Sequence, residues 1–108
     1  MNHPNTETVD VRLGERSYRV VIGAGILGSA GVRISELGLG KACAVVTDSN
    51  VGRLYADAVL RSLGDAGFKA TLITVPAGEQ SKSMDEVKVI CDAMIAAGLD
   101  RKGFVVAL

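Results

Sequence analysis

Hydrophobic and polar positions along the chain follow two alternating patterns, one typical of strands and one typical of helices. Continuous apolar runs rich in β-branched residues predict three buried strands, at 42–47, 70–75 and 104–108. Apolar residues at helical spacing predict helices that begin near 26, 51 and 83 and end before Gly38, Gly67 and Gly98. Strands that alternate with helices in this way form βαβ units. We therefore expect an α/β fold, with a Rossmann-like, mostly parallel sheet and helices on both faces.

Two further segments precede this pattern. Residues 8–13 and part of 18–22 alternate between apolar and polar positions, which predicts an antiparallel hairpin at the edge of the sheet. Residues 1–7 are expected to be a disordered lead-in. The chain has 108 residues, so we expect 8–108 to form one domain and leave no room for a second.

The helical pattern also predicts which side chains are buried. In the helix after residue 50, the face expected to contact the core is Val51, Leu54, Tyr55, Ala58 and Val59. Its other face alternates in charge and predicts a solvated stripe of Arg53, Asp57, Arg61 and Asp65. In the last helix, Ser83 and Glu86 fit a capping box, and the expected core face is Val87, Ile90, Cys91, Met94 and Ile95.

Composition excludes several classes of function. Lys and Arg total 12, as do Asp and Glu, so no excess charge attracts nucleic acid or an anionic membrane. No apolar stretch approaches the roughly 20 residues of a membrane span, and the N-terminus lacks the pattern of a signal peptide. We therefore expect a cytoplasmic protein with neither a nucleic-acid nor a membrane partner.

Cysteine and histidine are too few for a metal site. Cys43 lies in a strand-like run and Cys91 on the apolar side of a helix, which predicts two reduced core cysteines. His3 is the single histidine and lies in the lead-in. Because catalytic zinc needs about three convergent ligands, we expect no metal site in this chain.

A glycine motif lies between the hairpin and the first helix. Residues 23–28 match G-x-G-x-x-G, and Asp48 follows 20 residues after Gly28, as a dinucleotide-binding fingerprint requires. Such a fingerprint needs its strand at the centre of the sheet. The preceding strand is instead expected at an edge, and 13 glycines make a chance match easy. We favour the interpretation of 23–28 as a turn.

Two polar segments follow predicted parallel strands, at the edge where such sheets bind ligands. In the first, Asp48 could accept hydrogen bonds from an adenosine ribose, and Asn50 could offer its side-chain amide to the nucleotide. The alternative is that these residues serve only as helix caps. In the second, 76–83, Glu79 can accept hydrogen bonds from a ribose diol and Lys82 can donate to the hydroxyls or to a phosphate. The alternative for this loop is a solvated connection that caps the next helix.

The second segment resembles a known family. Residues 76–83 are similar to the P-x-G-E-x-x-K-S segment of 3-dehydroquinate synthases. Other stretches resemble that family in the same order: 11–18 with Ile22-Gly23, 46–51 with Leu54-Tyr55, and 98–101 before 105–108. The resemblance extends from about Val9 to Leu108, and four matches in register are far more specific than any single one.

This resemblance implies an enzyme of the shikimate pathway that binds NAD and a divalent metal, usually zinc or cobalt, and that forms a homodimer when full length. Family members convert the sugar phosphate 3-deoxy-arabino-heptulosonate 7-phosphate into 3-dehydroquinate and phosphate. NAD transiently oxidises a ring hydroxyl and is returned unchanged. Carried over to this chain, the residues that bind NAD at its adenosine half are Asp48, Asn50, Gly78, Glu79 and Lys82.

The resemblance also implies which parts are missing. The glycine run that binds the pyrophosphate begins just after Leu108, and the metal ligands lie further on, in a helical C-terminal domain. No residue of this chain is therefore expected to be catalytic. A few ribose contacts without the pyrophosphate cradle predict millimolar or weaker NAD affinity and no synthase activity for residues 1–108.

Two alternatives remain open. The first is a sister enzyme, either another sugar-phosphate cyclase or a metal-dependent polyol dehydrogenase, whose discriminating residues lie beyond Leu108. The second is a non-catalytic nucleotide-binding α/β module.

Overall fold

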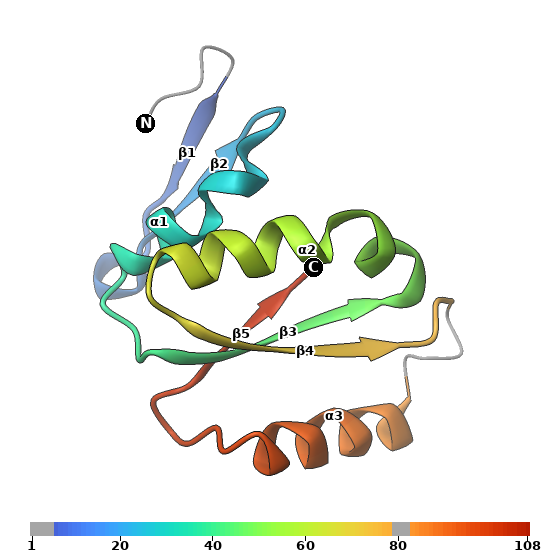
Figure 1. Cartoon of the computed structure of the whole chain (residues 1–108). Helices are drawn as coiled ribbons and strands as arrows, with labels where there is room; N and C mark the ends of the chain where they lie inside the picture. Colours follow the sequence, from blue (N-terminus) through green and yellow to red (C-terminus); the bar gives the residue numbers. More distant parts are fainter. Residues whose placement is uncertain (1–5, 79–82) are drawn as a thin grey trace.

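A computed structural model describes residues 6–78 and 83–108 and contains two sheets of different kinds (Figure 1). The first is an antiparallel pair, β1 (Glu7–Val11) and β2 (Tyr18–Ile22). The second is parallel, with the order β4-β3-β5, and consists of β3 (Ala42–Asp48), β4 (Lys69–Val75) and β5 (Phe104–Ala107). The predicted α/β class is confirmed, and the three runs predicted as buried strands form the three parallel strands, although no residue of β5 is buried.

The hairpin is present but forms a sheet of its own, not an edge of the parallel sheet. A 3-10 turn, η1 (Gly14–Arg16), connects its strands. After β2 the chain turns at once into helical structure. Val21 of β2 shares a hollow with Ile34 and Leu37 beside α1 (Ala30–Ser35). The hairpin therefore packs beside this helix and extends away from the parallel strands (Figure 1).

The helix expected from residue 26 is divided into a 3-10 turn, η2 (Ile26–Ser29), and the six-residue α1. Ser29 explains the division in part. Its hydroxyl donates to the carbonyl of Ile26 at 2.6 Å, and a serine hydroxyl that bonds the preceding turn competes with regular helical hydrogen bonds.

One face of the parallel sheet is covered by α2 (Ser49–Asp65) and carries the core. The buried cluster joins β3 to α2 and to the turn before β4, and consists of Cys43, Val45, Val59, Leu63 and Phe68. The rings of Phe68 and Phe104 meet edge to face, with centroids 5.3 Å apart. Aromatic pairs in this geometry add to the stabilisation from burial alone.

The buried face of α2 includes Val59, as predicted, but otherwise differs from the predicted face. Leu54 and Tyr55 are 66% and 48% exposed, whereas Ala56, Val59 and Leu63 are buried. Gly52 gives the reason, because a Cβ at this position would lie 2.8 Å from Cγ2 of Thr47 on β3. The glycine lets the start of α2 approach the sheet, so the helix contacts the core with small residues at its start. A search for large apolar side chains at helical spacing missed this face.

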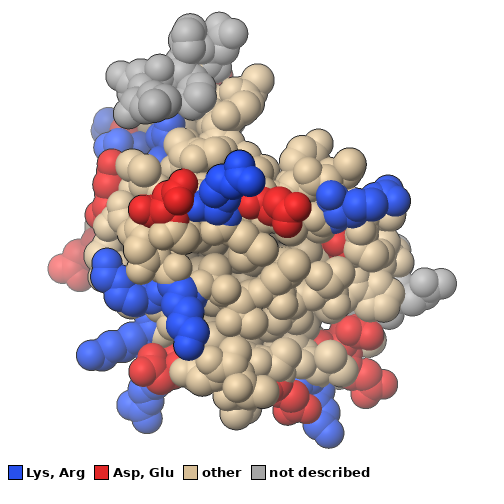
Figure 2. Space-filling view, viewed as in Figure 1, with Lys and Arg blue, Asp and Glu red and all other residues tan. Residues whose placement is uncertain are grey.

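The charged stripe of α2 was predicted correctly. All four of its residues are exposed: Arg53, Asp57, Arg61 and Asp65. Figure 2 shows them as a band of alternating sign across the helix. Within the described residues no ion pair forms along this band, and the pair that does form joins Arg19 to Asp10 on the hairpin.

A close contact fixes η2 and α1 against α2. A Cβ at Gly31 would lie 2.0 Å from the carbonyl oxygen of Ser62, so only glycine fits there. The Ser62 hydroxyl accepts from the Gly31 N–H at 2.8 Å and donates to the Gly28 carbonyl at 2.8 Å. This serine is 8% exposed, so its hydroxyl satisfies two backbone groups at a buried helix contact.

The other face of the sheet is covered by α3 (Met84–Ala96), which contacts β4 (Figure 1). Ser83 caps this helix as predicted, since its hydroxyl accepts from the Glu86 N–H at 3.2 Å. The predicted core face is not buried. No residue of α3 is buried, Ile95 is 73% exposed, and Cys91 is exposed. The prediction of two core cysteines is therefore correct for Cys43 and wrong for Cys91.

This open packing reflects how little of the described chain α3 contacts. It packs on β4, whereas α2 packs on β3 and β4 and is also covered by η2 and α1. Val105 on β5 is 53% exposed. β1 begins at Glu7, one residue before the predicted strand and within the lead-in predicted at 1–7, of which 1–5 lie outside the described residues. In the described part of the chain, no helix has the length and apolar character to cross a membrane.

Candidate nucleotide-binding site

The two polar segments identified from the sequence begin side by side. β3 and β4 are adjacent and parallel, and their last residues, Asp48 and Val75, are paired in register. The turn into α2 and the loop after β4 therefore leave the sheet at the same edge (Figure 1). In open α/β sheets this edge, at the carboxyl ends of the strands, is where ligands bind.

Asp48 has a structural role at this edge that leaves half of its carboxylate available. It is the N-cap of α2, and its Oδ1 accepts from the Val51 N–H at 2.7 Å. The carboxylate makes no other hydrogen bond within the described residues. Since an ionised carboxylate accepts at both oxygens, Oδ2 is free to accept from a ligand hydroxyl. The capping and the ligand-binding interpretations of Asp48 are thus compatible.

The next two residues, Ser49 and Asn50, form the first turn of α2 and are both exposed. The Asn50 amide makes no hydrogen bond within the described part of the chain, so its donors and its acceptor are available. The Ser49 hydroxyl accepts from the Ala77 N–H at 3.2 Å, across 28 residues of sequence. This contact links the two polar segments and was not predicted from the sequence, because a serine after an N-cap is a common helix residue.

The second segment is described only in part. Gly78 has a φ of 114°, a left-handed backbone conformation that residues other than glycine rarely adopt. Glu79 and Lys82 lie outside the described residues, so their predicted roles stay predictions. The structure thus brings Asp48, Asn50 and the start of the 76–83 loop to one edge.

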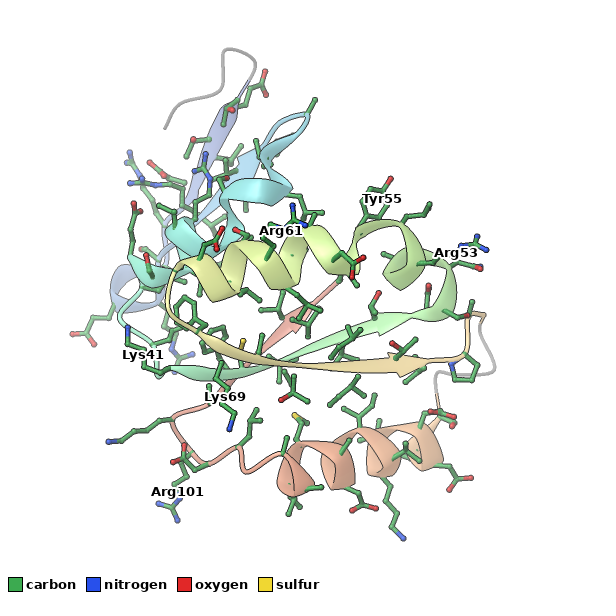
Figure 3. All side chains as sticks on the ribbon, viewed as in Figure 1. Lys41, Arg53, Tyr55, Arg61, Lys69 and Arg101 are labelled. Atoms are coloured by element: carbon green, nitrogen blue, oxygen red, sulfur yellow. The ribbon has the colours of Figure 1, made fainter. Side chains whose placement is uncertain are left out.

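Four cationic side chains lie at different ends of the parallel sheet. Lys41, Lys69 and Arg101 lie toward the end of the sheet where its strands begin, whereas Arg53 lies on the first part of α2 (Figure 3). The Nζ of Lys41 lies over the Phe68 ring, 5.6 Å from the ring centroid, in a cation–π contact. A phosphate at the candidate site would therefore find Arg53 nearest among these four cations.

The glycine motif at 23–28 forms a turn, which is the interpretation that its sequence favoured over a dinucleotide-binding fingerprint. Its strand, β2, lies outside the parallel sheet. Gly25 has a φ of 69° and precedes a 3-10 turn, so no long helix begins there. The Gly28 carbonyl accepts from Ser62, which gives this stretch a packing role.

Within residues 6–78 and 83–108, no three His, Cys, Asp or Glu side chains lie close enough to hold a metal ion. The described residues therefore do not fit a divalent metal. Both cysteines are free thiols. Burial among apolar side chains raises the pKa of the Cys43 thiol, which makes this thiol unreactive. An apolar hollow between α3 and β5, lined by Cys91, Met94 and Val105 among others, lies under the sheet and away from the candidate edge.

Comparison with solved structures defines the class of fold. No protein-family model matches the chain. The crystal structure of 2-deoxy-scyllo-inosose synthase matches 92% of the chain and 28% of its own length, with a TM-score of 0.78 at 18% identity. The 2-epi-5-epi-valiolone synthase ValA from Streptomyces hygroscopicus, solved with NAD+ and Zn2+ bound, matches 84% and 24% with a TM-score of 0.60 at 29% identity. The chain has the α/β fold found in sugar-phosphate cyclases.

Sequence comparison finds a narrower set of relatives. The chain is 41% identical over 105 residues to 3-dehydroquinate synthase from Rhizobium etli, covering 97% of the chain. It is 46% identical over 102 residues to 3-dehydroquinate synthase from Geobacter metallireducens, covering 94%. The chain spans about 28% of the length of these relatives. It is related to the 3-dehydroquinate synthases and corresponds to their N-terminal part, as the four motifs indicated.

Proposed function

We propose that this chain supplies the adenosine side of the NAD site in a 3-dehydroquinate synthase. The whole enzyme would convert 3-deoxy-arabino-heptulosonate 7-phosphate into 3-dehydroquinate and phosphate, as a phosphate-eliminating, cyclising lyase of the shikimate pathway. The proposal includes a cytoplasmic homodimer that uses NAD and a zinc or cobalt ion. Its residues for NAD are Asp48, Asn50, Gly78, Glu79 and Lys82.

The observation that carries this proposal is the register of β3 and β4. Because Asp48 pairs with Val75, the two segments with nucleotide-binding chemistry start one strand spacing apart, about 5 Å. A ribose spans a comparable distance and carries two hydroxyls. One sugar can therefore contact side chains from both segments.

The described residues fit NAD and do not fit the metal. Within the described residues, one carboxylate oxygen of Asp48 and the amide of Asn50 make no hydrogen bond, and both groups are suited to ribose hydroxyls. When bound, NAD would supply hydride transfer, whereas the described residues of this chain would only bind and orient its adenosine end. The metal ligands and the groups that contact the sugar phosphate would belong to other parts of the enzyme.

Another sugar-phosphate cyclase is the nearest competing function, since both solved structures named above belong to that class. The sequence relatives favour dehydroquinate synthase, because their identity is 41–46% against 29% for the valiolone synthase. Incubating the whole enzyme with the heptulosonate phosphate, NAD and a divalent metal tests the choice. Release of phosphate with formation of 3-dehydroquinate supports it, and turnover of a different sugar phosphate alone contradicts it.

The site itself is tested by titrating NAD into the isotope-labelled chain and following its amide resonances. We expect shifts at 48–50 and 76–78, with a dissociation constant of about a millimolar or weaker. Asp48→Asn is the sharpest variant, because asparagine caps a helix as well as aspartate does but removes the charge. We expect a loss of affinity of about tenfold or more without a change in stability. Shifts confined to other parts of the chain would contradict the site.

A further inference from the structure

The charged stripe of α2 alternates in sign without forming ion pairs on its own helix. It consists of four exposed residues, Arg53, Asp57, Arg61 and Asp65. Side chains four apart on a helix are close enough to pair, and yet no ion pair forms along the stripe within the described residues. Figure 2 shows the stripe on an open face, with no other element of the described chain over it. These charges are therefore available to a partner.

The same outer face of α2 differs in shape between its two ends. Near its start, Leu54 and Tyr55 are large apolar side chains that remain exposed. Near its end, Gly64 carries no side chain, and a Cβ at this position would meet no atom within 4 Å. The face therefore has an apolar projection at one end and open space at the other.

The order of the charges makes the stripe complementary to a reversed copy of itself. In an antiparallel pair of α2 helices related by a twofold axis at Val59, position 53 lies opposite position 65 of the second copy, and 57 lies opposite 61. Arg53 then faces Asp65 of the second copy, and Arg61 faces its Asp57. A twofold axis generates each of these contacts twice. A parallel pair in the same register would instead bring like charges together.

Helix packing is compatible with this arrangement. Residues four apart form a ridge on a helix, and the ridges of two helices lie side by side when the helices cross at about 50°. The charged stripe is such a ridge and extends over about 18 Å, at about 1.5 Å per residue. The twofold axis at Val59 also places Leu54 opposite Gly64 of the second copy, where the missing side chain leaves room for it.

We propose that the outer face of α2 is an interface with a second copy of this chain, in which the two helices pair antiparallel through the charged stripe. The proposed function includes a homodimer but assigns no surface to it. This inference goes further by assigning one, and it does not depend on NAD binding. Because each exposed ion pair contributes little, we expect a weak dimer, with a dissociation constant on the order of 0.1–1 mM at low ionic strength.

The test reverses the two central charges one at a time. Asp57→Lys puts a cation opposite Arg61 of the second copy, and Arg61→Glu puts an anion opposite Asp57. Each variant therefore repels its own copies, whereas a mixture of the two variants brings only opposite charges together. Lys88→Glu and Asp92→Lys are the matched controls, because they make the same changes of charge at exposed positions four apart on α3. Arg53 is left unchanged, since it lies toward the candidate site.

Sedimentation equilibrium at chain concentrations up to about 1 mM measures the dimer, and circular dichroism checks that each variant retains its helices. The unmodified chain should dimerise at about 20 mM salt and dissociate as the salt rises to about 500 mM, because salt screens exposed charges. Either reversal alone should weaken the dimer about tenfold or more. An equimolar mixture of the two should restore it, and the controls should change nothing. Adding one variant, unlabelled, to the other in isotope-labelled form should shift amide resonances within 53–65.

Three outcomes overturn this inference. The first is an unmodified chain that stays monomeric at low ionic strength. The second is a dimer that both reversals leave unchanged, because its surface then lies elsewhere. The third is a mixture of the two variants that stays monomeric. NAD titration keeps the proposed function separate: shifts at 48–50 in a monomeric chain support the nucleotide site, and their absence in a chain that dimerises contradicts that site alone.

Discussion

The two faces of the parallel sheet are packed to very different degrees. On the α2 face, five side chains form a buried cluster, and glycines at 31 and 52 allow helices and sheet to approach closely. On the α3 face, the helix contacts β4 and buries none of its own residues. The difference shows that an apolar helical pattern does not by itself produce a core, because α2 is buried between the sheet and a further layer, η2 and α1, whereas α3 packs chiefly on β4 among the described residues.

The candidate site belongs to both faces. Asp48 caps the tightly packed α2, whereas the 76–83 loop leads into the loosely packed α3. The bond between Ser49 and Ala77 therefore connects the first turn of α2 to the residues that follow β4.

The largest expected contrast comes from truncating one large side chain on each face. Leu63→Ala removes a fully buried side chain of α2 and should lower the free energy of unfolding by about 2–5 kcal/mol. Ile95→Ala, on α3, should change it by about 0.5 kcal/mol or less, because Ile95 is already mostly exposed. Urea denaturation of the two variants measures the difference. Equal losses would show that the faces are packed alike.

A smaller contrast compares two glycines that contact different surroundings. Gly31→Ala places a methyl group 2.0 Å from the Ser62 carbonyl and should destabilise the chain by about 1–3 kcal/mol. Gly64→Ala, on α2, meets no atom within 4 Å and should stabilise by about 0.5–1 kcal/mol. Thermal unfolding monitored by circular dichroism distinguishes the signs. A neutral Gly31→Ala would contradict the close contact of α1 with α2.

The helix caps provide a third comparison. Asp48→Ala and Ser83→Ala each remove a side chain that accepts from a helix N–H, at a cost of about 1 kcal/mol. The first should lower the stability of the whole chain, because α2 is part of the core. The second should speed amide exchange in α3 and leave global unfolding almost unchanged. Native-state hydrogen exchange checks this, and a global effect of Ser83→Ala would argue against a loosely held α3.

The smallest expected effect concerns the two thiols. Burial raises the pKa of Cys43 in the folded chain, so the folded state retains a proton that the unfolded state loses above about pH 8.5. The stability associated with this thiol is present below that pH and is lost as the pH rises toward the folded pKa. Between pH 8 and 10, the free energy of unfolding should therefore fall less steeply for Cys43→Ala than for the unmodified chain.

In the native chain, a thiol reagent should label Cys91 far faster than Cys43, and similar rates would contradict the burial of Cys43.

Much of the fold was predictable from local patterns. The strands β3 and β4 were predicted to within one residue, because a continuous β-branched run is a strong local signal. Both helix caps could also be identified, since Asp48 and Ser83 act on N–H groups three residues away. The burial of helix faces could not, because it depends on the partner surface. Gly52 and Gly31 carry no hydrophobic signal, and yet they decide where α2 and α1 sit.

The class of fold and the turn at 23–28 could be inferred from the chain alone, as could the positions of the two polar segments. These features follow from spacing and residue type, which act within a few positions of the chain. Three features emerged only in the folded chain: the hairpin stands apart, Leu54, Tyr55 and Cys91 are exposed, and Ser49 contacts Ala77. Each of them depends on which distant surface lies opposite, and short-range periodicity carries no information about that surface.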